Sequence, residues 1–308
     1  ESVRTAKKIP LVTGIFSGML AFSVLGYTWH RFLNKIDLNT SYIQSFRLFM
    51  AGQFMNSVTP LGQLGGEPVM AYIISGTEDT NYGKALSAVV SADIINTIPY
   101  ITFMLGGATY LILFDTLNST IAQTASITLL ITIVGGIIAY LLWFRAYVIE
   151  KAVMSTATKV VDLTNRGDHL LEPLEDRISH LKETFDSIGE DPAHLASTAA
   201  VAHIFFLLQV VALYFVIASI GETVAISSLY FVIAVSSLAN FSPTPGGSGT
   251  YEAAMAGELI AFTPFSFALV LTVSDLYRVA PYRYGLIIGY IALVGLMSKN
   301  VLMIRAIP

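Results

Sequence analysis

Long apolar segments that are almost free of charge leave this chain very few kinds of fold. Ile9–Trp29 contains no charged residue, and Ile121–Phe144 is equally uninterrupted. A transmembrane helix needs about 20 such residues, so each segment is long enough to cross a bilayer. Charged residues make up 12% of the chain, whereas soluble domains carry about 25%. The sequence therefore predicts an all-α polytopic membrane protein.

About eight apolar segments are expected, with an internal pseudo-repeat. The others are Ser41–Met55, Ala85–Phe114, Ala196–Ser219, Thr223–Phe241, Leu259–Ser274 and Tyr284–Ile304. The stretch at about 145–195 differs because it is rich in charge. Within it, apolar residues from Leu171 to Ile188 step by three and four, as on one face of an amphipathic helix. We expect a single transmembrane domain over 1–308 with a polar, helical, cytoplasmic insert at about 145–195.

The placement of lysine and arginine predicts the orientation. These residues gather before the first segment, in the insert and after the last segment, whereas 115–120 and 220–223 contain none. Cytoplasmic loops of membrane proteins are enriched in Lys and Arg. We therefore expect a multi-pass protein of the cell membrane, with the insert and both termini in the cytoplasm.

Two apolar segments run into a Pro-Gly motif of the same spacing. The first motif contains Thr59-Pro60-Leu61-Gly62 and the second Thr244-Pro245-Gly246-Gly247, and each reaches a glutamate eight residues after its threonine (67 − 59 and 252 − 244). Membranes tolerate broken backbone only where protein or water surrounds it. Breaks at matching positions of two halves point to a transporter binding site. We expect two broken or re-entrant helices, related by either a parallel or an inverted repeat.

Both motifs also predict the start of a helix. Proline favours the first turn, so Pro68 predicts a helix that begins near it, and Thr250 is a candidate N-cap for the helix that follows. Free N–H groups at such ends receive phosphate or carboxylate. The alternative is that both motifs are tight turns between helices and hold no ligand.

Three carboxylates in apolar surroundings are candidates for ion or proton coupling, or for a cationic head group: Glu67, Asp93 and Glu252. A charge at the bilayer centre costs at least about 2.5–3.5 kcal/mol, so it needs a reason to be there. The alternative is local capping, or a hydrogen bond between helices. His203 has the same two interpretations, with the hydrogen bond favoured.

Arginines supply candidate phosphate contacts, because the guanidinium is a planar fork that matches phosphate. Arg47 interrupts an apolar run, and Arg278 and Arg283 lie in a tyrosine-rich stretch; Asp275 is three residues before Arg278, on one helix face. The alternative is that they extend to the membrane surface. The candidate substrate-binding set comprises these arginines, Glu67 and Glu252, with Asn56, Pro60, Gly62, Gly65, Gly66, Asn240, Pro245, Gly246, Gly247 and Gly249.

Other kinds of chemistry find no support. The chain has no cysteine, its histidines lack metal-binding spacing, and Gly246-Gly247-Ser248-Gly249 lacks the lysine of a P-loop. We therefore expect no catalytic residue, no metal and no cofactor. The net charge of −4 and the absence of a basic run also argue against a nucleic-acid partner.

Three ordered motifs resemble a known family. Arg47 through Tyr72, Pro243 through Glu252, and Arg278-x2-Pro281-x3-Gly285 are similar to the signatures of the flippase-like integral membrane family of the lysylphosphatidylglycerol synthase transmembrane region. Met70 departs from the pattern, since many relatives have arginine there. The resemblance implies translocation of an anionic or zwitterionic phospholipid, or of a polyprenyl-phosphate-linked lipid, between leaflets. The expected partners are membrane lipids, a separate lipid-modifying synthase and a second copy of the chain, because no synthase domain is seen here.

Three alternatives stay open. An ion-coupled secondary transporter of a small solute would use the same broken helices. A membrane-embedded enzyme acting on a lipid-linked substrate would need Glu67 and Glu252 within roughly 6 Å of each other, where one carboxylate perturbs the other. A scaffold for a separate synthase would use the cytoplasmic insert as its contact surface.

Overall fold

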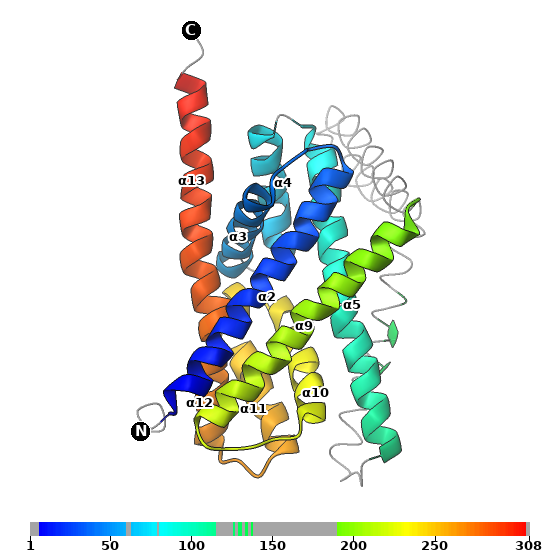
Figure 1. The fold of residues 1–308 in the computed structure, drawn as a ribbon, viewed down its shortest axis with the longest axis vertical. Helices are drawn as coiled ribbons and strands as arrows, with labels where there is room; N and C mark the ends of the chain where they lie inside the picture. The colour runs from blue at the N-terminus through cyan, green and yellow to red at the C-terminus, as the bar shows by residue number, and fades with distance from the viewer. Residues whose placement is uncertain are drawn as a thin grey trace, which may run out of the picture.

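The computed structural model describes residues 6–59, 63–78, 80–114, 126, 129–130, 133–134, 137 and 190–305. Nearly all of the expected insert, and most of Ile121–Phe144, lie outside these residues. Within them, the regular structure is helical throughout and contains no strand (Figure 1). The all-α prediction is confirmed for this part of the chain.

The described helices form one bundle. They are α2 (Lys8–Lys35), α3 (Tyr42–Val58), α4 (Gln63–Thr77), α5 (Tyr82–Phe114), α9 (Pro192–Ser219), α10 (Ile226–Ser236), α11 (Thr250–Phe262), α12 (Phe267–Tyr277) and α13 (Gly285–Arg305), with the 3-10 turns η1 (Ser237–Phe241) and η2 (Pro245–Gly247) and the π-helical segment η3 (Val279–Tyr284). By length and composition, four candidate membrane spans lie in the described part: Lys8–Lys35, Tyr82–Thr109, Pro192–Ser219 and Phe267–Ser298.

The end of the chain is divided differently from the prediction. The expected segment Leu259–Ser274 is split, because α11 ends at Phe262 and α12 begins at Phe267. Thr263 is extended and Pro264 follows it, which stops the helix. Conversely, η3 joins α12 to α13 in one interrupted helix. The π-helical segment contains Pro281, whose missing N–H cannot continue a regular α-helical ladder.

Two helical hairpins enter the bundle from opposite ends. The first consists of α3 and α4, which pack against each other, and the second consists of α10 and α11, which do the same. Figure 1 shows the first hairpin in one half of the bundle and the second in the other half. These four helices have 17, 15, 11 and 13 residues, fewer than the roughly 20 that a span needs. None of the four helices is therefore long enough to cross a bilayer by itself.

The two hairpins have matching spacing along the chain. Thr77 ends α4 and Phe262 ends α11, while Tyr82 begins α5 and Phe267 begins α12; each pair is 185 residues apart (262 − 77 and 267 − 82). The same offset relates Glu67 to Glu252 (252 − 67). The hairpins lie in opposite halves of the bundle (Figure 1), as an inverted repeat would place them, and the repeat itself stays a prediction.

Small residues bring the long helices together. A Cβ added at Gly14 of α2 would lie 2.9 Å from the Ala212 carbonyl oxygen of α9. Ser17 also donates a hydrogen bond to the Leu208 carbonyl at 2.8 Å. Small residues and hydroxyls hold helices together where apolar burial gives no driving force, as in lipid.

Polar side chains also join α5 to α9. The Nε2 atom of His203 lies 2.9 Å from the Thr102 hydroxyl, and its Nδ1 atom lies 2.7 Å from the Ala199 carbonyl. Helix-to-helix bonding, the favoured interpretation of His203, is therefore what the structure shows.

The outer faces of the bundle are apolar. Ile9, Val12, Phe16 and Leu20 form an exposed row on α2, and a second row on α13 consists of Ile287, Tyr290, Ile291, Val294 and Met297. The spacing of three and four places each row on one helix face. Exposed apolar stripes of this length suit contact with hydrocarbon rather than water.

The start of α2 and the end of α13 lie at opposite ends of the bundle (Figure 1). Four candidate membrane spans lie among the described helices. The expectation that both termini lie in the cytoplasm stays a prediction.

A polar contact fixes the start of α9 against the end of α2. Asp191 accepts the backbone N–H of His194 at 2.9 Å, and Lys35 Nζ donates to Asp191 at 2.8 Å. The Lys35 hydrogen bond, followed by that of His194, lowers the pKa of Asp191. A depressed carboxyl pKa adds stability that is present above its unfolded pKa and is lost as the pH falls through the folded value.

We expect Asp191→Asn to remove this acid dependence. The unfolding temperature of the purified chain would be measured in detergent from pH 7 down to pH 3. Below about pH 4, the usual aspartate pKa, the wild type should lose more stability than the variant, and the two curves should converge. Glu222→Gln, in an exposed loop, is the control. Curves that stay parallel would show that the Lys35 contact adds nothing.

Candidate functional site at the hairpin tips

The tips of the two hairpins touch. Gly246 of η2 has φ +57°, and a Cβ added to it would lie 3.0 Å from the Ser57 carbonyl oxygen, near the end of α3. The second motif therefore packs on the residue that leads into the first. Pro60, Leu61 and Gly62 lie outside the described residues, so on the side of the first hairpin the contact is described at Ser57.

Glycines shape the second tip. Gly246, Gly247 and Gly249 all have positive φ, at 57°, 67° and 81°, a region that other residues avoid. A Cβ at Gly247 would lie 3.0 Å from the Ala239 carbonyl and 3.4 Å from Asn240 Oδ1. Pro245 begins η2, as its fixed φ favours. The chain can turn this tightly only with glycine at these three places.

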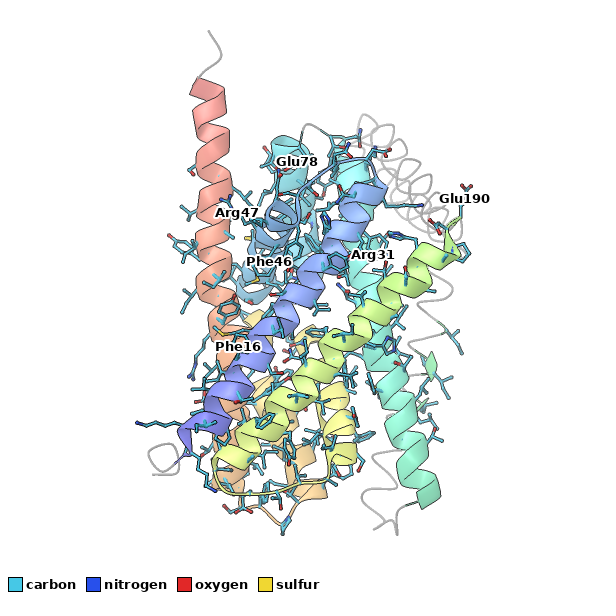
Figure 2. All side chains as sticks on the ribbon, in the orientation of Figure 1. Phe16, Arg31, Phe46, Arg47, Glu78 and Glu190 are labelled. Atoms are coloured by element: carbon cyan, nitrogen blue, oxygen red, sulfur yellow. The ribbon has the colours of Figure 1, made fainter. Side chains whose placement is uncertain are left out.

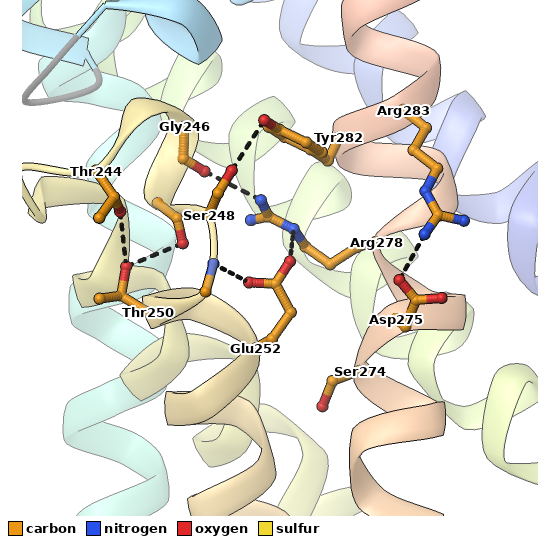
Figure 3. A network of polar contacts seen from close by, with 12 residues as sticks. Thr244, Gly246, Ser248, Thr250, Glu252, Ser274, Asp275, Arg278, Tyr282 and Arg283 are labelled. Carbon is orange, nitrogen blue, oxygen red and sulfur yellow. Dashed lines mark hydrogen bonds and ion pairs between the residues drawn. The ribbon is translucent and has the colours of Figure 1, made fainter.

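Hydroxyl groups line the same tip. Ser242 lies 2.8 Å from Thr244 and 2.7 Å from Thr250, and Thr250 donates to the Gly247 carbonyl at 2.9 Å. Figure 3 shows this network beside the arginine site. Pro245, Ser248, Gly249 and Thr250 are exposed. The tip thus presents a polar surface well inside the bundle.

The start of α11 differs from the prediction by one residue. Thr250 is its first residue and Gly249 is the N-cap. Glu252 accepts the Gly249 backbone N–H at 2.8 Å, which is the glutamate half of a capping box. A positive φ is needed just before the helix, and glycine supplies it more easily than threonine. Glu252 therefore both caps the helix and faces the tip.

Arg278 ties this tip to α12. Its Nε atom lies 3.0 Å from Glu252 Oε1 as an ion pair, although not in line for a hydrogen bond, and a terminal nitrogen donates to the Gly246 carbonyl at 3.1 Å. The guanidinium carbon lies 4.8 Å from the centre of the Tyr251 ring and 4.2 Å from that of Tyr282. Arg278 is 5% exposed. The positive charge of Arg278 is therefore compensated by Glu252, the Gly246 carbonyl and the two tyrosine rings.

The neighbouring polar residues make separate contacts. Ser248 donates to the Tyr282 hydroxyl at 2.9 Å. Asp275 pairs with Arg283 across the π-helical segment, not with Arg278, and both members of that pair are more than half exposed (Figure 3). Asp275 and Arg278, three residues apart at the end of α12, thus have separate partners. Arg283 consequently lies apart from the tip.

The first hairpin carries a tight contact of its own. A Cβ at Gly66 would overlap Asn56 Oδ1 and lie 2.9 Å from the Asn56 backbone nitrogen. Helix α4 starts at Gln63, five residues before the expected start at Pro68, and includes Gly65 and Gly66. Both glycines are part of the helix. Because Gly66 has no Cβ, α4 can pack directly against Asn56 of α3. Pro68 is consequently inside the helix.

Arg47 lies in the seam between α3 and α13. One of its terminal nitrogens would be 2.8 Å from a Cβ at Gly295, and Figure 2 shows the side chain directed toward α13. It is half-buried. Among the described residues, no carboxylate forms an ion pair with it. Of the three predicted arginines, Arg47 is therefore the one without a counter-charge in this part of the chain.

Asp93 and Asn96 of α5 bind side chains of α2. Trp29 Nε1 donates to Asp93 Oδ1 at 3.2 Å. One turn further along α5, Asn96 accepts a hydrogen bond from Thr28 at 2.8 Å. Glu67 is half-buried on α4, and the structure joins Glu252, not Glu67, to an arginine.

Sequence reasoning missed Trp29 and Tyr251. Tyr251 is next to Glu252 inside the second motif, so its position in the sequence could have marked it as part of the site. Trp29 is far from both motifs in the sequence, and only packing brings it to Asp93.

The comparisons with known proteins identify the family. Residues 1–289 match the family described as Lysylphosphatidylglycerol synthase TM region. The chain belongs to this family. No solved structure matches it.

Similar curated proteins come from archaea. The UPF0104 membrane protein PH1989 of Pyrococcus horikoshii is 24% identical, over 92% of this chain and 85% of its own. The UPF0104 membrane protein MJ1595 of Methanocaldococcus jannaschii is 25% identical, over 89% and 81%. A UPF0104 membrane protein of Methanothermobacter thermautotrophicus is 22% identical, over 86% and 77%. The protein is thus a membrane protein of the lysylphosphatidylglycerol synthase TM region family, as its three motifs predicted.

Proposed function

We propose that this member of the lysylphosphatidylglycerol synthase TM region family is a lipid translocase. It would move an anionic or zwitterionic phospholipid, or a polyprenyl-phosphate-linked lipid, between leaflets of the cell membrane. One observation carries the proposal: two hairpins enter from opposite ends and their tips touch at Ser57 and Gly246. Broken helices that meet inside an inverted repeat are typical of substrate sites in transporters.

The polar tip gives a head group a path through the bundle. Moving a polar group into hydrocarbon without hydrogen bonds costs several kcal/mol. The exposed hydroxyls and backbone around Ser248 and Thr250 would replace water for the head group, while the acyl chains stay in lipid. Re-entry of each hairpin from its own side would give access from both leaflets.

Arg47 is the proposed phosphate contact. It has no counter-charge among the described residues, and it lies at the seam of α3 and α13, whose outer face is apolar. A phosphate arriving from the lipid would meet it there. Arg278 would act through the tip that it holds and not as a free phosphate contact.

The proposed orientation places the C-terminal end of α2 in the cytoplasm. Lys35, Lys84 and the end of α13, with Lys299 and Arg305, belong to that end. The other end has Lys7 and Lys8 at the start of α2, and its described loop 220–225 contains no Lys or Arg. The positive-inside rule favours this side.

Fluorescent-lipid scrambling tests the function. Purified protein would be reconstituted into vesicles with a trace of lipid labelled on its head group or chain, and outer-leaflet label would be bleached with dithionite. Active protein should expose about all of the label, whereas protein-free vesicles expose about half. We expect Arg47→Gln to slow exposure about tenfold or more, the value of one charge-assisted hydrogen bond. Lys8→Gln should not.

The outcome that contradicts the proposal is equally clear. If no phospholipid and no polyprenyl-phosphate lipid crosses faster than in protein-free vesicles, with and without ion gradients, the protein is not a lipid translocase. Loss of activity in Lys8→Gln as large as in Arg47→Gln would remove Arg47 from the site.

A second candidate is an ion-coupled transporter of a small solute. The inverted hairpins favour it as much as they favour lipid, and uptake of solute into the same vesicles would distinguish the two. A membrane-embedded enzyme would need Glu67 and Glu252 together. Instead, Glu252 has Arg278 as its neighbour.

A further inference from the structure

A guanidinium without a counter-charge lies where α2 packs on α9. Arg31 of α2 donates from Nε to the Thr198 hydroxyl at 2.7 Å and from one terminal nitrogen to the Ser197 hydroxyl at 2.6 Å. The same nitrogen reaches the His194 carbonyl at 3.5 Å. These acceptors are neutral, so they orient the guanidinium without cancelling its charge. Within the described part of the chain, no carboxylate forms an ion pair with Arg31.

The acidic residues before α9 do not supply the missing charge. Asp191 pairs with Lys35 at 2.8 Å, one turn further along α2. Glu190 is exposed, and Figure 2 shows it beyond the start of α9, away from Arg31. The second terminal nitrogen of Arg31 has no hydrogen-bond partner among the described residues and is not sealed in the interior. One donor of a positively charged group is therefore free to bind a ligand.

The exposed face of α9 beside Arg31 changes character along the helix. Its residues follow one another in steps of three and four, which places them on one side of the helix. From the start of the helix they are Ala193, Ser197, Ala200, Ile204, Leu207 and Val211. The first three are small and the last three are large and apolar. Small side chains thus lie at the level of Arg31, and an apolar surface continues beyond them.

Helix lengths place Arg31 at the boundary of the hydrocarbon. Both α2 and α9 are candidate spans of 28 residues, hence about 42 Å long, which is about the thickness of a bilayer with its head groups. Arg31 lies four residues before the end of α2, and Ser197 lies five residues after the start of α9. Both are therefore about 6–8 Å inside the helix ends, where the head groups of one leaflet meet the acyl chains.

A phospholipid matches these features together: an anion for the free donor, at the depth of a head group, and a chain for the apolar surface below it. We infer that Arg31 binds the phosphate of an anionic phospholipid from the surrounding leaflet, with an acyl chain along the exposed face of α9. The planar guanidinium suits phosphate. A zwitterionic lipid would bring its own ammonium and leave the net positive charge in place. This site is separate from the hairpin tips and does not rest on the proposed function.

Native mass spectrometry of the intact chain tests this site, because it counts the lipids that stay bound. Arg47→Gln would serve as the parent, so that the lipid counted is not the one proposed to meet Arg47. The lipid-stripped parent would be titrated with dioleoylphosphatidylglycerol or dioleoylphosphatidylcholine, and glycerol phosphate would be added as an anion without chains. We expect one phosphatidylglycerol to bind about tenfold or more tightly than phosphatidylcholine, the value of one charge-assisted hydrogen bond. Glycerol phosphate at the same concentration should not displace it.

Replacing Arg31 should remove the preference for the anionic lipid. In Arg31→Gln, the two lipids should bind about equally, whereas Arg31→Lys should keep part of the preference, because it retains the charge but loses the planar fork. Arg283→Gln is the matched control, since it removes an exposed arginine that is paired with Asp275; it should bind as the parent does. If Arg31 served only to hold α2 against α9, its loss would lower the unfolding temperature and leave the preference unchanged.

Three results would overturn the inference: equal binding of the two lipids by the parent, an unchanged preference in Arg31→Gln, or displacement by glycerol phosphate at equal concentration. Circular dichroism would show whether each variant is folded, and Arg31→Lys keeps the test informative if Arg31→Gln does not fold. Binding at Arg31 requires no lipid movement. A failed scrambling assay therefore refutes the translocase alone, and a failed binding test refutes the Arg31 site alone.

Discussion

Arg278→Ala should lower the free energy of unfolding by about 3–5 kcal/mol, the usual cost of removing one partner from a buried ion pair. Glu252 would be left without its counter-charge, and Gly246 would lose the donor to its carbonyl. The contacts of the guanidinium with the Tyr251 and Tyr282 rings would also be lost. Unfolding would be followed by circular dichroism as sodium dodecyl sulfate is added to mixed micelles.

Arg283→Ala is the matched control, because this arginine also pairs with a carboxylate but is exposed. Exposed pairs contribute about 0–1 kcal/mol, so it should unfold nearly as the wild type does. Arg278→Ala combined with Glu252→Gln should be less damaging than the sum of the two single changes, since the stranded charge is gone. If the Arg278 and Arg283 variants unfold alike, the ion pair does not hold the tip.

Gly246→Ala should separate the hairpin tips and abolish transport. A Cβ at this position would lie 2.6 Å from the Tyr282 ring and 3.0 Å from the Ser57 carbonyl. The positive φ adds about 1–2 kcal/mol of strain for any residue with a Cβ. The ring can rotate, but the Ser57 backbone can move only if the tip withdraws from α3. Scrambling and unfolding would be measured on the same preparation.

Two other glycines divide this effect into its parts. Gly249 has φ +81° with nothing within 4 Å of an added Cβ, so Gly249→Ala tests strain alone. Gly257 lies inside α11 with open space around it, so Gly257→Ala should stabilise the helix by up to about 1 kcal/mol. We expect activity to fall in the order Gly257, Gly249, Gly246. Equal activity of the Gly249 and Gly246 variants would show that contact with Ser57 is unimportant.

If both results hold, the hairpin contact is a structural requirement of transport and not a consequence of packing. Arg278 and Gly246 are joined by one hydrogen bond, from the guanidinium to the Gly246 carbonyl oxygen. A change at either residue should therefore loosen the same tip, and the two variants should slow the same lipid.

The sequence by itself determined that the helices lie in a membrane, which family the chain belongs to and where the helices break. Apolar length without charge, as in Ile9–Trp29, is a local property that leaves only a membrane helix. Likewise, clustered Pro and Gly favour a break in a helix, so both motifs were visible as breaks. Matching glutamates at the same spacing then indicated a repeat.

Only the tertiary structure decided which polar residues meet and how the two hairpins lie. Both opposing directions of a hairpin satisfy the same hydropathy, so their arrangement appears only when α3 and α10 are placed in space. Equally, nothing in the sequence shows that Asp93 meets Trp29 or that Arg278 meets Glu252, because packing alone brings each pair together. Electrostatic partnership depends on distance and burial, and neither is encoded in spacing along a chain whose partners lie on different helices.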